Sequence, residues 1–218
     1  MTEQPPVSVR TRFEKFPATV KGAFVFRGED ADPHQVVVRE GRVVRLPGAT
    51  GRPLPVERLT VDVPPHQDVF VPFELPIGDL DPGWYGFEVE VEVDGSPQRM
   101  AGDRRFPIAW PRGTVRTGTV RVEKQILLGS IRVAVDRLQL ATDSTTIRFS
   151  VQPPELVTVK LEAGRSRVDV LSIDLDEETG AGSATAYPLR RGERSARIEF
   201  QRRVRGGTER ADLTVELP

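Results

Sequence analysis

The chain has 218 residues, a formal net charge of −1, two histidines and no cysteine. This length suits one large or two ordinary domains, and a β-sandwich of about 100 residues fits into it twice. The lack of cysteine excludes disulfides and cysteine-ligated zinc or iron–sulfur sites, and it agrees with a reducing compartment.

Residues 1–6 have no basic start and no apolar run, so they do not resemble a signal peptide. No window approaches the roughly 18 uninterrupted apolar residues that a membrane-spanning helix needs. We therefore expect a cytoplasmic protein without a membrane span.

Apolar and polar residues alternate with a period of two along most of the chain, whereas Pro and Gly, 19 of each, interrupt any helical periodicity. In the first half the alternation predicts strands at residues 7–15, 18–27, 35–46, 55–63, 68–75, 84–93 and 98–108. Strands with turns at this spacing are typical of a sandwich. Pro72 predicts that the fifth of these strands is an edge or carries a bulge. Glu88, Glu90 and Glu92 predict that one face of the sixth strand is solvated.

The sixth strand follows the segment Leu80-Asp81-Pro82-Gly83-Trp84-Tyr85. This segment resembles the tyrosine corner of immunoglobulin-like and fibronectin type III-like β-sandwiches, and the resemblance covers about half of the chain. It implies that the Tyr85 ring is buried and that its hydroxyl bonds to the backbone of the preceding loop. Unlike antibody domains, the chain has no cysteine, and Phe87 stands where those domains place their second one. Apolar packing alone must therefore hold the core.

The segment Ala109-Trp110-Pro111-Arg112-Gly113 is the expected domain boundary. We expect Trp110 either to fill the junction or to be the last core residue of the first sandwich. After the boundary the alternation predicts strands at residues 114–123, 127–136, 145–152, 156–162, 166–174, 183–188, 195–203 and 209–217. The predicted fold is all-β, with two tandem immunoglobulin-like antiparallel β-sandwiches. The N-terminal sandwich takes residues 1–110, and the C-terminal sandwich, which lacks a tyrosine corner, takes residues 111–218.

Both histidines fall in loops that gather at one end of an immunoglobulin-like sandwich. The sequence therefore predicts that His34 and His66 are neighbours at an exposed tip. The same loops supply the further candidate ligands Asp32, Asp68 and Asp94, a mixture that suits zinc or manganese. Their spacing matches no standard metal motif, so ordinary polar turns are the favoured interpretation. We expect no metal and no other cofactor.

A second acidic segment, Asp174–Gly180, begins like a calcium loop because carboxylates recur at alternate positions. Its glycine comes one position too late, however, and Thr185 stands where a calcium loop has its bidentate glutamate. This segment therefore favours a hairpin connection with a charged tip.

Arginines are concentrated between residues 190 and 210, where eight arginines face three acidic residues. Six of them are candidates for contact with a partner: Arg190, Arg191, Arg194, Arg202, Arg203 and Arg205. Nucleic-acid binding is disfavoured, because proteins that bind single strands interleave aromatic residues and this segment offers only Phe200, with Tyr187 nearby. Arg197, Glu199, Gln201 and Arg203 share one face of a strand, which favours paired charges on a solvated surface.

Signatures of catalysis are missing from the chain. It has no cysteine nucleophile, no Gly-x-Ser-x-Gly elbow and no phosphate-binding loop, and no helix is predicted after Gly180-Ala181-Gly182. We expect a non-enzymatic cytoplasmic binding or scaffolding protein, whose protein partner docks through sandwich loops or edges. The alternative is a metal- or anion-dependent function, at the His34/His66 tip or at the basic segment Arg190–Arg210.

Overall fold

The computed structural model describes residues 5–48 and 51–218, so four of the six N-terminal residues that do not resemble a signal peptide lie outside it. The described residues form strands β1 to β17 and no helix. Accordingly, no helix in this part of the chain is long and apolar enough to cross a membrane. The chain divides into two compact units, Met1–Ile108 and Ala109–Pro218, which we call the first and second units.

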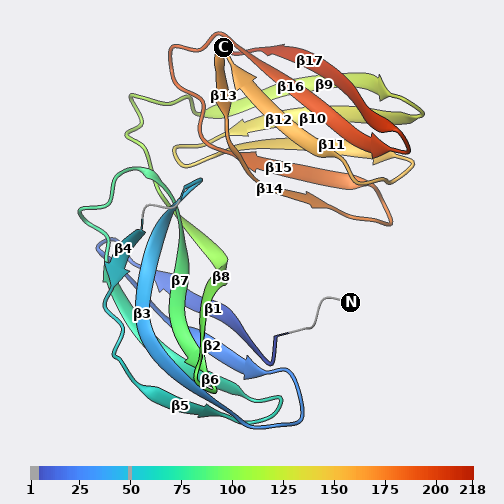
Figure 1. Ribbon diagram of the computed structural model, residues 1–218. Coiled ribbons are helices and arrows are strands. Elements are labelled where there is room, and N and C mark those ends of the chain that lie inside the picture. The colour runs from blue at the N-terminus through green and yellow to red at the C-terminus, as the bar shows by residue number, and fades with distance from the viewer. Residues whose placement is uncertain (1–4, 49–50) are drawn as a thin grey trace. The chain divides into compact units, whose positions relative to one another are not determined.

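The first unit is an antiparallel sandwich of two sheets (Figure 1). One sheet has the order β1-β2-β6, from β1 (Val7–Lys15), β2 (Thr19–Gly28) and β6 (Asp68–Pro76). The other has the order β4-β3-β7-β8, from β4 (Gly51–Leu54), β3 (His34–Leu46), β7 (Gly83–Val93) and β8 (Ser96–Ile108), and β5 (Thr60–Val63) also pairs with β3. Strand β6, which carries Pro72, lies at an edge as predicted. Strand β4 was not predicted, because Gly-Arg-Pro-Leu shows no alternation.

The predicted tyrosine corner is present at the start of β7. The Tyr85 side chain is buried, its hydroxyl donates to the Asp81 carbonyl oxygen at 2.8 Å, and its ring stacks on Phe106. Phe87, which replaces the cysteine of antibody domains, is fully buried against Phe13, Phe24, Phe73 and Phe106, with ring centroids 4.7 to 6.4 Å away. A cluster of phenylalanines thus occupies the position that a disulfide takes in antibodies.

The second unit is a sandwich of a five-stranded and a four-stranded sheet, both antiparallel. The five-stranded sheet has the order β14-β15-β11-β10-β9, from β14 (Val170–Leu175), β15 (Ala181–Ala186), β11 (Thr145–Gln152), β10 (Ile131–Leu140) and β9 (Gly118–Leu128). The four-stranded sheet has the order β13-β12-β16-β17, from β13 (Ser166–Val168), β12 (Thr158–Ala163), β16 (Ser195–Val204) and β17 (Gly207–Glu216). Apart from β9 and β13, this is the strand arrangement of an immunoglobulin sandwich. Strand β9, the first strand of the unit in sequence, forms an additional edge of the five-stranded sheet.

Each unit has its own apolar core. In the first unit the core residues come from both sheets and include Phe24, Val36 and Phe87. In the second unit they include Ile147, Ile198 and Phe200, and Phe149 packs edge-on against Phe200 with centroids 5.2 Å apart.

Two predictions for the second unit, and one of the two alternatives for Trp110, were wrong in detail. The first turn lies at Gly129-Ser130 and not near residues 124–126, because Gly129 adopts the left-handed conformation that a tight hairpin needs (φ 60°). The strand predicted at 166–174 is divided between the two sheets, as β13 and β14. Trp110 is not a core residue of the first sandwich, since its ring packs on Tyr187 and its backbone N–H donates to the Thr142 carbonyl oxygen.

Candidate functional site

At the loop end of the first unit, Asp94 is the one predicted metal ligand that is hydrogen-bonded to His34. His34 is buried at the start of β3, and its two ring nitrogens face carboxylates on either side: Nδ1 lies 2.6 Å from Asp94 and Nε2 lies 2.7 Å from Asp30. The hydrogen bond with Asp94, followed by that with Asp30, raises the pKa of His34. The pKa values of Asp30 and Asp94 are both lowered, chiefly by their hydrogen bonds with His34.

The remaining candidate ligands at this end do not join His34. His66 is exposed in the turn before β6 and has a left-handed backbone (φ 57°). Its backbone N–H donates to the Gly28 carbonyl oxygen, so it lies at the same end of the sandwich as the loop that leads to His34. Asp32 is exposed, and Asp68 forms ion pairs with Arg10, Arg12 and Arg27. Within residues 5–48 and 51–218 no group of three potential ligands is arranged to hold a metal ion. The contacts of His34 instead tie the loop before β3 to the turn after β7.

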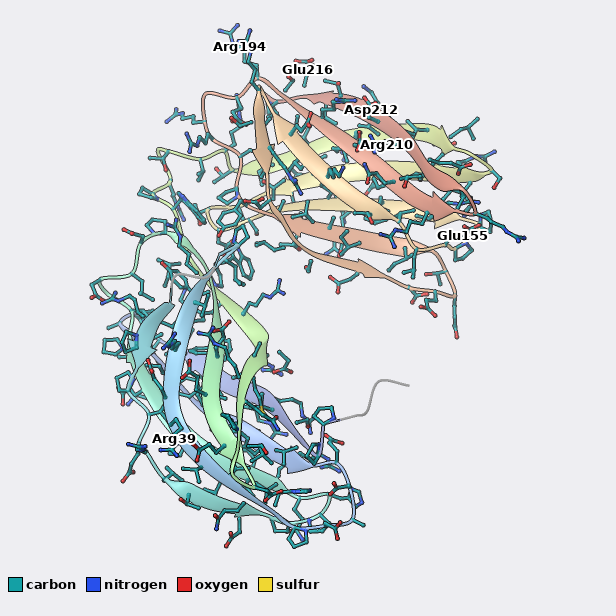
Figure 2. All side chains as sticks on the ribbon, in the orientation of Figure 1. Arg39, Glu155, Arg194, Arg210, Asp212 and Glu216 are labelled. Atoms are coloured by element: carbon teal, nitrogen blue, oxygen red, sulfur yellow. The ribbon has the colours of Figure 1, made fainter. Side chains whose placement is uncertain are left out.

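The basic segment Arg190–Arg210 does not form one patch. Arg190, Arg191 and Arg194 precede β16, whereas Arg202, Arg203 and Arg205 lie at or beyond its far end. Strand β16 has ten residues, and at about 3.3 Å per residue the two groups lie roughly 30 Å apart. Figure 2 shows Arg194 at one end of the second unit and Glu155, an ion-pair partner of Arg202, at the other.

Arg202 is an inward-facing residue and not part of an open surface. It has the same parity along β16 as the core residues Ile198 and Phe200, and its side chain is only 15% exposed. Its guanidinium pairs with Glu155 at 3.1 Å and Glu209 at 3.7 Å, and it donates to the Ser130 hydroxyl. Arg202 therefore helps to close the end of the sandwich.

The outer face of the four-stranded sheet carries paired charges, as the sequence predicted. Arg197 pairs with both Glu162 and Asp212, and Lys160 pairs with Glu199. Asp212 projects from β17 between the labelled side chains of Arg210 and Glu216 (Figure 2). The outer face of the first unit's larger sheet is similar, since Glu88, Glu90 and Glu92 are neutralised by Arg39, Arg42 and Arg99.

A different surface lies on the outer face of the five-stranded sheet, where a groove of about 850 Å³ crosses β9, β10, β11, β15 and β14. Small residues line its middle, namely Ala134, Ser150, Ala181 and Ser183. Gly182 also lines it, and a Cβ atom there would lie 2.5 Å from the Phe149 ring below. The groove is open to solvent, and its middle carries only these small side chains, with longer ones such as Gln125 and Arg148 beside them.

Charged residues surround this floor unevenly. The cations Lys124, Arg137 and Arg148 come from β9, β10 and β11, and the acids Asp174 and Asp176 come from β14 and the turn that follows it. Asp176 accepts hydrogen bonds from the N–H groups of Glu178 and Thr179, so the acidic segment forms the predicted hairpin turn, and these bonds lower the pKa of Asp176. Two further acids, Glu123 and Asp136, lie beside the cations.

The groove is built where the β9–β10 pairing is irregular. Strand β10 has a bulge at Asp136, and opposite it Glu123 adopts a left-handed backbone (φ 47°), which is uncommon for a residue with a side chain. Sequence reasoning missed this site. Its cations, Arg137 and Arg148 among them, are spread over three strands and become neighbours only through the observed register.

No protein-family model and no curated protein matches the chain. Among solved structures, a conserved domain protein from Bacillus anthracis aligns with 99% of this chain and 89% of its own, at 11% identity and a TM-score of 0.42. A marsupial T cell receptor aligns with 98% of each chain, at 12% identity and a TM-score of 0.28. Similarities this low do not bear on function, and the site must be interpreted from its own chemistry.

Proposed function

We propose that the chain is a non-catalytic cytoplasmic binding protein and that a protein partner docks an extended segment into the groove of the second unit. The observation that carries the proposal is the open groove of about 850 Å³ on one sheet face, lined by small residues between charges of both signs. A floor without large side chains allows another main chain to approach closely, and a polar rim of this kind is usual for protein interfaces.

The chemistry of the groove favours binding over catalysis. Its hydroxyl groups belong to Ser150 and Ser183, and the second unit contains no histidine and no cysteine. Neither serine therefore has an imidazole base within its own unit, as a serine nucleophile would normally require. The absence of cysteine from the whole sequence fits a reducing compartment, which supports our placing the protein in the cytoplasm.

Groove-filling substitutions test this proposal. Ala134→Trp places a large side chain on the groove floor, and Thr214→Trp places the same side chain on exposed β17 of the other sheet as a matched control. The wild type and both variants are used to capture proteins from the native cytoplasm, and the captured proteins are quantified by mass spectrometry.

We expect a protein that the wild type and Thr214→Trp retain equally and that Ala134→Trp loses. Retention by Ala134→Trp would contradict docking in the groove. A variant of the loop end, such as His66→Trp, would then test docking through the loops of the first unit.

A further inference from the structure

Three arginines lie side by side across the five-stranded sheet. Arg121 of β9 is directly opposite Arg137 of β10, and Arg137 is directly opposite Arg148 of β11. The row continues through Ser183 of β15 to Asp174 of β14. Four of the five lie between inward-facing neighbours, and Arg137 lies between the exposed Asp136 of the bulge and the buried Leu138, so the row belongs to the outer face that carries the groove.

The bulge in β10 creates this arginine row. Strands β10 and β11 pair regularly from Arg132 with Gln152 to Val135 with Phe149. Continuing that register would place Asp136 opposite Arg148, an attractive pair. The bulge instead shifts the register by one residue and brings Arg137 opposite Arg148. A single irregularity therefore replaces an opposite-charge pair with a like-charge pair.

Little within the second unit neutralises the arginine row. Among the described residues, the Arg121 side chain forms no hydrogen bond or ion pair, and Arg148 forms one hydrogen bond, to the neutral Gln139 at 3.5 Å. Arg137 pairs with its neighbour Asp136 at 3.6 Å, but both side chains are about half exposed, so this pair is weak. Like charges directly opposite each other destabilise a sheet, and here no compensating acid spans the row.

We propose that the arginine row recognises carboxylates of an acidic extended segment of the partner protein, with the segment crossing the sheet from β9 towards β14. This inference rests on the proposed function and specifies its partner. Neighbouring strands are about 4.8 Å apart, so the row from Arg121 to Asp174 spans roughly 19 Å, or about six extended residues. Because the row ends in Asp174, a basic residue suits that end of the segment.

A nucleic acid fits this surface less well than an acidic peptide. The phosphates of a nucleic acid repeat along its whole length, and Asp136, Asp174 and Asp176 would repel them at several points of the groove. Stacking of bases also requires exposed aromatic rings, whereas the aromatic residue in the lining, Phe149, is buried in the core. A segment with separated carboxylates and a basic end avoids both problems.

Peptide probes test the proposal directly. The probe is a fluorescein-labelled peptide of about eight residues in which glutamate alternates with serine and lysine ends the chain; its counterpart has glutamine for every glutamate. Fluorescence anisotropy measures their binding to the full chain, to Arg148→Ser, to Arg121→Ser with Arg148→Ser, and to Arg203→Ser. The last is a matched control, because Arg203 is exposed near the end of β16 in the other sheet.

We expect saturable binding of the glutamate peptide that weakens about three- to fivefold in Arg148→Ser and about tenfold or more in the double variant, since each exposed ion pair is worth up to about a fivefold change. Arg203→Ser should bind as the wild type does. The melting temperature of the second unit should rise by about 1–4 °C in Arg148→Ser, because a like-charge contact is removed. A higher melting temperature would show that weaker binding does not result from misfolding.

Equal binding of the two peptides, no binding of either, or binding that the arginine substitutions leave unchanged would each overturn the acidic-segment proposal. Tighter binding of a single-stranded oligonucleotide than of the glutamate peptide would also overturn it. None of these results decides whether a partner occupies the groove, because that is judged separately by the capture experiment with Ala134→Trp.

Discussion

The two separate cores predict that each unit unfolds by itself, and substitution of the central phenylalanine of either core tests this. Phe87 is 1% exposed and touches four other rings, whereas Phe200 is 0% exposed in the core of the second unit. Replacing a buried phenylalanine by alanine costs about 3–5 kcal/mol through lost transfer energy and the cavity that remains. This is a large part of the roughly 5–15 kcal/mol that stabilises a domain.

The expected shift in melting temperature follows from the size of the unit. An unfolding entropy of about 2.1 cal/mol/K per residue gives roughly 0.23 kcal/mol/K for a unit of this length. A loss of about 4 kcal/mol therefore lowers the midpoint by about 15–20 °C. Phe87→Ala should lower the first unit's midpoint by this amount and leave that of the second unchanged, and Phe200→Ala should do the reverse.

The chain provides a reporter for each unit, because its two tryptophans, Trp84 and Trp110, lie in different units. Thermal unfolding is followed by intrinsic fluorescence in a Trp110→Phe background for the first unit and in a Trp84→Phe background for the second. If Phe87→Ala lowers the Trp110 transition as much as the Trp84 transition, the units unfold as one and the inference of independent cores is wrong.

Two further predictions concern the first unit, both followed by Trp84 fluorescence. Tyr85→Phe removes the hydrogen bond to Asp81 and should lower the free energy of unfolding by about 1 kcal/mol; an unchanged midpoint would show that the corner contributes only packing. Because Asp94 and Asp30 raise the pKa of His34, its contribution to stability should be complete below about pH 6.5 and decline as the pH rises through the folded-state pKa. The lowered pKa values of Asp30 and Asp94 predict a second decline as the pH falls through those values. His34→Gln should therefore have a flatter melting profile as the pH rises above about 6.5, and an identical slope in wild type and variant would contradict this.

Local chemistry made the first unit predictable from sequence. The Pro-Gly turn before Tyr85 and the alternation of β7 fix which side chains face inward, so the strand after the corner and the burial of Tyr85 and Phe87 are as predicted. The short strand β4 was missed because it is held by pairing with β3 and has no alternation of its own. The loops around His34 were placed at the right end, but the partnership with Asp30 depends on the loop's exact path.

In the second unit, the alternation of residues along the sequence does not indicate which side chains strand pairing brings together. Arg190 to Arg205 appeared to form one patch because they are close in sequence, yet an extended strand separates its ends and turns Arg202 inward. Conversely, Arg121, Arg137 and Arg148 are distant in sequence and adjacent in the sheet. Their alignment depends on the hairpin turn at Gly129 and on the bulge at Asp136, and a shift of one residue in either changes every pairing beyond it.

The four outer sheet faces differ in how completely their charges are paired. On three of them arginines meet acids: Asp68 pairs with Arg10, Arg12 and Arg27, the β7 glutamates pair with Arg39, Arg42 and Arg99, and Arg197 pairs with Glu162 and Asp212. A surface that needs only to be soluble and stable gains from such cross-strand pairs.

The fourth face, the outer face of the five-stranded sheet, lacks such pairing along its arginine row. A regular β10–β11 register would have placed Asp136 opposite Arg148 and formed such a pair. Glu123, beside the bulge in β10, also has a left-handed backbone conformation, which costs a residue with a side chain about 1–2 kcal/mol. Two local costs therefore coincide at one irregularity in the groove. Natural sequences tolerate such departures mainly where activity or binding requires them, which supports our proposal that a partner docks on the arginine row.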